Sequence, residues 1–126
     1  MQHINVIRGG NLFEDLNHQL EGSINHGKFN GAWSKHSVKI DDNSILNKII
    51  KNDRIEVAST HHQGIKDLGH DLVPVAWSDD GLIEAIEDSN SPNSFIAIQW
   101  HPELMPHNTN QKKLFNWLIG EAKKRS

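Results

Sequence analysis

Cysteine is absent from the 126 residues of this sequence. Disulfide bonds, thiolate metal sites and a cysteine nucleophile are therefore excluded within the chain. Long apolar runs are also lacking, since none approaches the roughly 20 residues that a membrane-spanning helix requires. From these absences we expect a cytoplasmic protein with no membrane partner.

A strong charge of either sign is lacking as well. The formal net charge is -3, which is too small to gather nucleic acid or an anionic lipid surface. The length allows one small domain with a hydrophobic core and is too short for two. We therefore predict a single domain over residues 1–126 and expect no nucleic-acid partner.

The hydrophobic pattern predicts one α/β unit without internal repeats. Helices are expected over residues 1–8, 45–50 and 110–124, and strands over 36–40, 54–59, 72–77, 82–87 and 95–100. The segment Asp41-Asp42-Asn43-Ser44 supplies turn and capping groups for the helix over 45–50. Asp79-Asp80-Gly81 predicts a tight hairpin between the third and fourth strands, because Asp-Gly supplies the positive φ angles of such a turn. The polar stretch from Asn17 to Lys35 is expected to be mainly loop.

Two apolar segments are expected to be buried. The run Phe95-Ile96-Ala97-Ile98-Gln99-Trp100 lacks alternation, which is typical of a central strand covered on both faces. In the last helix, a stripe of four residues is expected to face the core, namely Leu114, Trp117, Leu118 and Ala122. The first helix has no capping residue, so we expect its first turn to lie outside this chain.

The first candidate site is Trp100-His101-Pro102-Glu103, directly after the most apolar strand. In open α/β sheets, ligands bind beyond the carboxyl ends of the strands. A carboxylate two residues from a histidine can accept a hydrogen bond from one ring nitrogen and fix the tautomer. The other nitrogen is then free to take a proton from a nucleophile. His101 and Glu103 are therefore candidates for a base and its orienting group, unless they merely flank a strand end.

The second candidate site is Ser59-Thr60-His61-His62-Gln63-Gly64, which also follows a predicted strand. Adjacent side chains in extended backbone point in opposite directions, so at most one of His61 and His62 would face a shared site. Together with His101 they are also candidate ligands for zinc or nickel. The simplest alternative is a polar turn.

The sequence contains nine histidines, and five of them lie among polar residues. We expect these five to be solvated surface groups: His3, His18, His26, His36 and His70. A nucleophile for the His101 base is missing, because the chain has no cysteine and no serine in a Gly-x-Ser-x-Gly elbow.

The order and spacing of these motifs resemble the γ-glutamyl-γ-aminobutyrate hydrolases, a branch of the class I glutamine amidotransferases. That family carries a serine followed by His-His-Gln, an Asp-Gly turn before Ile-Glu-Ala-Ile-Glu, and finally Gln-Trp-His-Pro-Glu. The matching residues here are Ser59, His61-His62-Gln63, Asp80-Gly81, Ile83-Glu84-Ala85-Ile86-Glu87 and Gln99-Trp100-His101-Pro102-Glu103.

The resemblance implies that residues 1–126 are the carboxy-terminal portion of a glutamine amidotransferase-like domain. The implied fold is a partial three-layer, flavodoxin-like sheet of the class I type, with a β-hairpin or meander and a carboxy-terminal helix. In that family a cysteine nucleophile sits in a Gly-x-Cys-x-Gly-x-Gln elbow, and Gln2 matches its last residue. The implied Cys–His–Glu triad would use His101 as base and Glu103 as orienting group, with the cysteine upstream of Met1. The residues that match the glutamyl pocket are Gln2, Ser59, His61, His62 and Gln63.

The substrate implied by the resemblance is a γ-glutamyl amide, hydrolysed through a thioester without a cofactor or a metal ion. We expect the chain alone to be inactive and either poorly stable or self-associating, with a separate amino-terminal piece as a candidate partner. Two alternatives stay open. One is a non-catalytic remnant or binding module of the same fold, and the other is a His-rich metal-binding domain.

Overall fold

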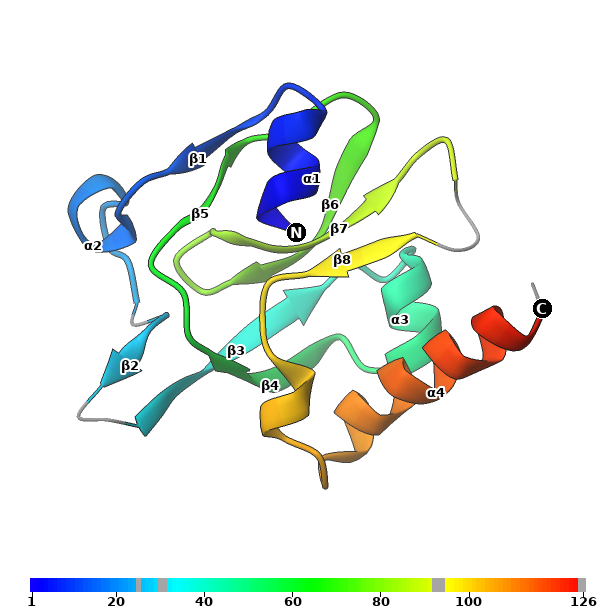
Figure 1. The fold of residues 1–126 in the computed structure, drawn as a ribbon. Coiled ribbons are helices and arrows are strands. Elements are labelled where there is room, and N and C mark those ends of the chain that lie inside the picture. Colours follow the sequence, from blue (N-terminus) through cyan, green and yellow to red (C-terminus); the bar gives the residue numbers. More distant parts are fainter. Residues whose placement is uncertain (25, 30–31, 92–94, 125–126) are drawn as a thin grey trace.

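The computed structural model describes residues 1–24, 26–29, 32–91 and 95–124 (Figure 1). The helices within this part are α1 (Gln2–Ile7), α2 (Leu16–Gln19), α3 (Ile45–Ile50), the 3-10 helix η1 (Pro102–Leu104) and α4 (Thr109–Lys124). The strands are β1 (Asn11–Phe13), β2 (Lys28–Phe29), β3 (Ala32–Ile40), β4 (Arg54–Ser59), β5 (Gly64–Asp67), β6 (Leu72–Ser78), β7 (Ile83–Asp88) and β8 (Ile96–Ile98).

The strands form one sheet in the order β1-β5-β7-β6-β3-β2, with β4 paired to β3 and β8 paired to β7. Every pairing among the described residues is antiparallel. The predicted α/β unit with a hairpin and a terminal helix is therefore confirmed. The sequence pattern did not reveal β1, β2, β5 or α2, because elements of two to four residues are too short to show a period.

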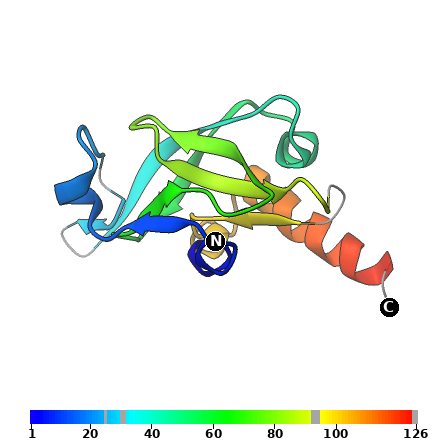
Figure 2. The ribbon, with the colours of Figure 1, turned by 90° about the horizontal axis from the view of Figure 1, so that it is seen from above.

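The helices lie in two separate groups (Figures 1 and 2). α1 packs against β1 and β5, whereas α3 and α4 pack against each other at another end of the sheet. The main core lies beside α3 and contains ten buried residues: Val38, Ile40, Leu46, Ile50, Ile55, Val57, Val75, Ala76, Ala85 and Trp100. A smaller buried cluster of Ile65, Leu72 and Ile86 lies under α1, where Ile4 packs against it.

The predicted hairpin joins β6 to β7. Gly81 in its turn has a φ of +83°, a conformation that glycine adopts without steric strain. Asp80 Oδ1 accepts hydrogen bonds from the Ser78 hydroxyl and from the Leu82 N–H (3.2 Å). The turn therefore fixes the position of the Asp80 carboxylate.

A fully buried asparagine attaches α1 to the sheet. The Asn5 side-chain amide donates to the carbonyls of Asn11 (3.1 Å) and Asp67 (3.0 Å). Its oxygen accepts from the Gly69 N–H at 2.8 Å. Because the Asn5 side chain is fully buried, these hydrogen bonds replace the ones it would make with water and are required for stability. Asn5 thereby positions α1, which also carries Gln2.

The amino terminus of α3 receives two caps. The Ser44 hydroxyl accepts from the Asn47 N–H at 3.0 Å, as its sequence position predicts. The buried carboxylate of Glu87, on β7, accepts from the N–H groups of Ile45 (3.2 Å) and Leu46 (2.9 Å). A carboxylate at this end also complements the helix dipole. Glu87 therefore connects α3 to the sheet.

Two predictions about buried segments are wrong. β8 is not a central strand, because among the described residues it pairs only with β7. Its two faces are each covered in part, since Ile96 and Ile98 pack against the main core and Ala97 packs against the smaller cluster. In α4 the fully buried residue is Gln111, whereas Leu118 is 58% exposed.

The predicted stripe on α4 holds only in its first half. Leu114 packs against the main core and Trp117 is half-buried, but Leu118 and Ala122 are exposed. The reason is that the later turns of α4 extend away from the sheet (Figure 2). Periodicity shows which residues share a face of a helix, but it does not show whether that face packs against the core. None of the described helices combines the length and apolarity needed to cross a membrane.

We predict that Glu87→Ala destabilises the chain by about 2–3 kcal/mol, because two helical N–H groups lose a charged acceptor in a buried place. Chemical denaturation followed by circular dichroism would measure the change. Glu56→Ala is the matched control, since Glu56 is exposed on β4, and its effect should stay within about 0.5 kcal/mol. Equal effects of the two substitutions would contradict the assigned role of Glu87.

Candidate functional site

The side chains of His101 and Glu103 contact each other directly. His101 Nδ1 lies 2.6 Å from Glu103 Oε1, and the two side chains are 39% and 60% exposed. With Nδ1–H donated to the carboxylate, Nε2 is the ring nitrogen left to accept a proton. The arrangement expected from the two-residue spacing is present, and it is open to solvent.

Backbone contacts hold this pair at the rim of the sheet. Pro102 begins η1, which follows the strand and carries Glu103 back toward His101. The His101 N–H donates to the carbonyl of Ala58 at 3.0 Å, so the histidine lies beside the end of β4. Trp100 is buried behind it, and its indole N–H donates to Gln111 Oε1 at 3.0 Å. The backbone of His101 is therefore held in place by β4 and by the buried Trp100.

The pKa of Glu103 is held below its ordinary value. Partial burial acts in the opposite direction, but hydrogen bonds from its own backbone N–H and from His101 outweigh it. The carboxylate therefore stays ionised near neutral pH, as a group that orients an imidazole must.

Gln2 contacts two other glutamine residues, Gln63 and Gln99, that lie far from it in the chain. The Gln2 side-chain amide donates to the Gln63 carbonyl and to Gln99 Oε1, both at 3.2 Å. Gln2 comes from α1, Gln63 from the loop between β4 and β5, and Gln99 lies two residues before His101. The structure thus brings two predicted binding residues together and adds Gln99, which the sequence analysis did not select. Its place in the Gln-Trp-His-Pro-Glu motif was the available signal.

The other predicted binding residues point in different directions. His62 is exposed, whereas the His61 side chain is only 6% exposed, so one of the two faces inward, as predicted. His61 turns toward Glu84, with Nε2 at 3.7 Å from Oε1. Ser59 is completely buried, and its hydroxyl has no hydrogen-bond partner among the described residues. The roles of these residues in substrate binding stay predictions.

Two histidines expected at the surface are buried, so that prediction is wrong. The side chains of His26 and His36 are 1% and 6% exposed. His26 Nε2 lies 2.6 Å from Asp80 Oδ2, and both histidines face the fully buried Glu84. The polar residues around them in the sequence gave no sign of this burial, because burial depends on contacts with distant segments.

Glu84 is the residue that sequence reasoning missed here. The available signal was a glutamate among apolar residues in a predicted strand. The neighbouring Leu82 and Ala85 are buried, and a carboxylate buried with them needs a cation or a hydrogen-bond donor as partner. In the described part of the chain, the group with metal-ligand spacing is His26, His36 and Glu84. That group is not the set of His61, His62 and His101 considered from the sequence.

The chain is similar in sequence to a peptidase family and to glutamine amidotransferase-like proteins. The family model described as Peptidase C26 matches residues 1–103. Protein NtpR of Enterococcus hirae is 35% identical over 124 residues, which is 96% of this chain and 52% of NtpR. YvdE of Lactococcus lactis, whose name marks it as glutamine amidotransferase-like, is 39% identical over 105 residues, which is 82% of this chain and 42% of YvdE.

A further relative has a named reaction. The γ-glutamyl-γ-aminobutyrate hydrolase PuuD of Escherichia coli is 35% identical over 69 residues, which is 54% of this chain and 27% of PuuD. The chain therefore spans about half the length of the curated relatives it matches, or less.

A solved structure confirms the predicted fold class. It is described provisionally as one subunit of a GMP synthase from Thermoplasma acidophilum, and it superposes with a TM-score of 0.72 at 21% identity. The match covers 98% of this chain and 54% of that one. The likeness extends to the fold alone.

We predict that replacing His101 with Asn raises the pKa of Glu103 toward its ordinary value, because one hydrogen bond to the carboxylate is lost. Carbon-detected NMR titration of the carboxyl groups would measure this, with the Glu56 resonance as an internal reference. In the wild type, the stability due to this depressed pKa is present above the unfolded-state pKa. It is lost as pH falls through the folded-state value. An unchanged Glu103 midpoint in the variant would show that the contact is absent in solution.

Proposed function

The chain belongs to the peptidase C26 family of glutamine amidotransferase-like proteins, and we propose that it carries the general base of a γ-glutamyl amide hydrolase. The observation that carries the proposal is the 2.6 Å contact between His101 Nδ1 and Glu103 Oε1 at an exposed rim. A base held in one tautomer by a carboxylate is what acyl transfer to a nucleophile requires.

In the proposed reaction, His101 Nε2 takes the proton of a thiol as the thiolate attacks the γ-carbonyl of the substrate. The imidazolium then returns a proton to the leaving amine, and a thioester forms. Water activated by the same nitrogen hydrolyses the thioester and releases glutamate. Glu103 stabilises the imidazolium in both steps. Residues 1–126 contain no cysteine, so the proposal requires a thiol from outside them.

Gln2, Gln63 and Gln99 are the proposed contacts for the glutamyl part of the substrate. The Gln2 side-chain amide donates to the Gln63 backbone carbonyl and to the Gln99 side chain, and Gln99 precedes His101 by two residues in the chain. A glutamyl group offers an ammonium and a carboxylate, which amide groups can bind without a fixed counter-charge. The weaker candidates for substrate contacts are Ser59, His61 and His62. Ser59 and the His61 side chain are buried, and only His62 is exposed to a ligand.

A second function is favoured by one observation, the absence of cysteine from the chain. In that case the fold is a non-catalytic binding module that retains the glutamyl contacts. In both cases the proposed location is the cytoplasm. The proposed partners are a γ-glutamyl small molecule and either a separate segment carrying the nucleophile or a second copy of this chain.

We predict that the purified chain alone releases neither ammonia from glutamine nor glutamate from γ-glutamyl-γ-aminobutyrate. Activity should appear when the chain is co-expressed with a segment that carries a Gly-x-Cys-x-Gly elbow. Coupled glutamate assays on both preparations would measure this. Steady turnover by the chain alone, free of contaminating enzyme, would contradict the need for an external thiol. Binding of γ-glutamyl ligand without any turnover in the assembled form would favour the non-catalytic module.

In the assembled form, His101→Asn should lower kcat by roughly 10⁴-fold or more, because the thiol loses its base. Glu103→Gln should lower it by a smaller factor, since the amide can still contact the ring. His107→Asn is the matched control, because His107 is exposed and outside the pair. If His101→Asn kept the wild-type rate while the assembly formed normally, His101 would not be the base.

A further inference from the structure

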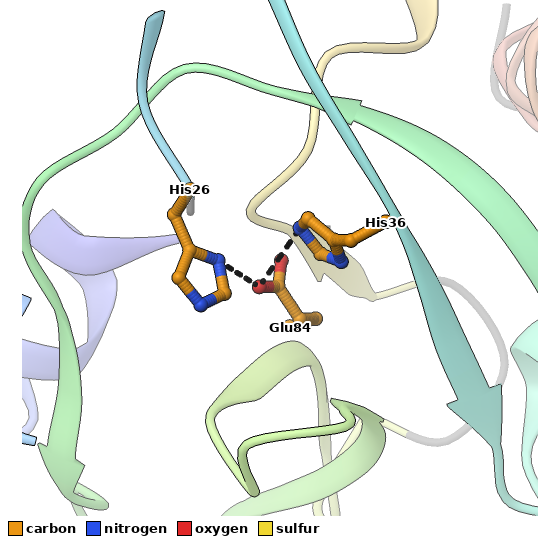
Figure 3. A group of neighbouring side chains, drawn as sticks. All are labelled: His26, His36 and Glu84. Atoms are coloured by element: carbon orange, nitrogen blue, oxygen red, sulfur yellow. Dashed lines mark ion pairs between the residues drawn. The ribbon is translucent and has the colours of Figure 1, made fainter. Parts of the chain in front are cut away.

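Three segments of the chain direct histidine side chains at one buried carboxylate on a fourth segment. Glu84, on β7, is fully buried and is surrounded by His26 before β2, His36 on β3 and His61 after β4. Figure 3 shows His26 and His36 converging on the Glu84 oxygens from different strands and loops. The three imidazole side chains are 1–6% exposed.

The distances from Glu84 Oε1 to the three imidazole nitrogens are close to the edge length of a tetrahedral metal site. His26 Nδ1 lies 3.1 Å from Glu84 Oε1, and the Nε2 atoms of His36 and His61 each lie 3.7 Å from it. Four ligands about 2.0–2.1 Å from a zinc ion are roughly 3.3 Å apart. The ligand atoms of His26, His36 and Glu84 all lie within 4.8 Å of one another.

Each imidazole uses its outer nitrogen for a different partner. His36 Nδ1 contacts the Ser37 carbonyl at 3.1 Å, and His61 Nδ1 contacts the Gln63 carbonyl at 2.7 Å. His26 Nε2 contacts Asp80 at 2.6 Å. A carbonyl or carboxylate accepts only from N–H, so the inner nitrogen of a neutral ring keeps its lone pair. Such outer contacts orient the histidine ligands of metal ions in proteins.

The inner atoms have no hydrogen-bond partner among the described residues. They are His26 Nδ1, His36 Nε2, His61 Nε2 and both carboxylate oxygens of Glu84. Lone pairs that face a carboxylate repel it, and each unpaired buried polar atom costs about 1–3 kcal/mol. A cation at the centre would satisfy all of them together.

A proton is the competing cation. Burial alone would lower the pKa of His26, but the carboxylates of Asp80 and Glu84 outweigh burial and raise it to about 9. One proton on His26 satisfies one nitrogen and leaves those of His36 and His61 without a partner. A divalent ion satisfies all three.

We propose that His26, His36 and Glu84 bind a divalent transition-metal ion of the zinc type, with His61 Nε2 as the fourth ligand and Asp80 orienting His26. Two or three imidazoles with one carboxylate suit Zn²⁺ and its neighbours in the series rather than Mg²⁺ or Ca²⁺. The site is closed and therefore structural. It would tie the loop that carries Gln63 to β3 and β7, independently of the proposed hydrolase reaction.

The first test is zinc binding by the 126-residue chain. The protein is freed of metal with a chelator, incubated with Zn²⁺, separated from excess ion by gel filtration, and analysed by mass spectrometry for metals. We expect about one zinc per chain and a Tm raised by on the order of 10 °C when free Zn²⁺ is about 100 times Kd. Co²⁺ in place of zinc should give the visible absorption of a tetrahedral complex.

Variants then identify the ligands. Glu84→Gln and His36→Gln should abolish retention of zinc and the rise in Tm. Asp80→Asn, which keeps the shape of the turn, should weaken zinc binding about 10–100-fold. His107→Gln is the control and should bind zinc like the wild type. Asp80→Asn keeps the test decisive if the ligand variants do not fold, because it changes affinity without removing a ligand.

The proposal is overturned if the folded wild-type chain retains no zinc and its Tm does not respond to Zn²⁺ or Co²⁺. The cluster would then be a protonated histidine network. It is also overturned if Glu84→Gln and Asp80→Asn both bind zinc as tightly as His107→Gln, because the ion would then lie elsewhere. Both outcomes are separate from hydrolase activity, which depends on His101 and an added thiol.

Discussion

Three buried carboxylates on β7 organise the structure around that strand. Glu84 faces the histidine cluster, Glu87 accepts the N–H groups that begin α3, and Asp88 pairs with Arg8 at 2.7 Å. The hydrogen bond from Arg8 holds the pKa of Asp88 below its usual value. A buried carboxylate without a partner is strongly destabilising. Each of these three therefore requires a specific partner segment. The partners come from the end of α1, from α3, from β3, and from the loops before β2 and after β4.

The same strand positions the exposed His–Glu pair. The Glu84 carbonyl accepts from the Gln99 N–H at 2.8 Å, and the Ala58 carbonyl accepts from the His101 N–H at 3.0 Å. The segment that ends in the proposed base is thus fixed between β7 and β4, although its side chains face solvent. The buried histidine cluster and the exposed pair share this framework. The buried carboxylates of β7 therefore connect the helices and loops to the sheet, whereas the proposed chemistry takes place beyond the end of the neighbouring strand β8.

Local signals in the sequence were sufficient for features that involve neighbours in the chain. Asp80-Gly81 marked the hairpin, Ser44 marked the start of α3, and the spacing of His101 and Glu103 allowed their contact. Two predictions that depended on packing against a distant part of the chain were wrong. Leu118 has the right period for a core position on α4, but the helix leaves the sheet before that residue. β8 is apolar throughout, but among the described residues only β7 pairs with it.

The sequence by itself determined the order of the longer strands and helices, the hairpin and the His101–Glu103 motif, because these depend on backbone preferences and short spacings. Only the tertiary structure decided that His26 and His36 leave the surface and meet Glu84. Their separation in the chain is large, and the free energy of a buried charge depends on what surrounds it in space rather than in sequence. In the same way, only the tertiary structure shows that Gln2 and Gln99, which are 97 positions apart in the chain, contact each other.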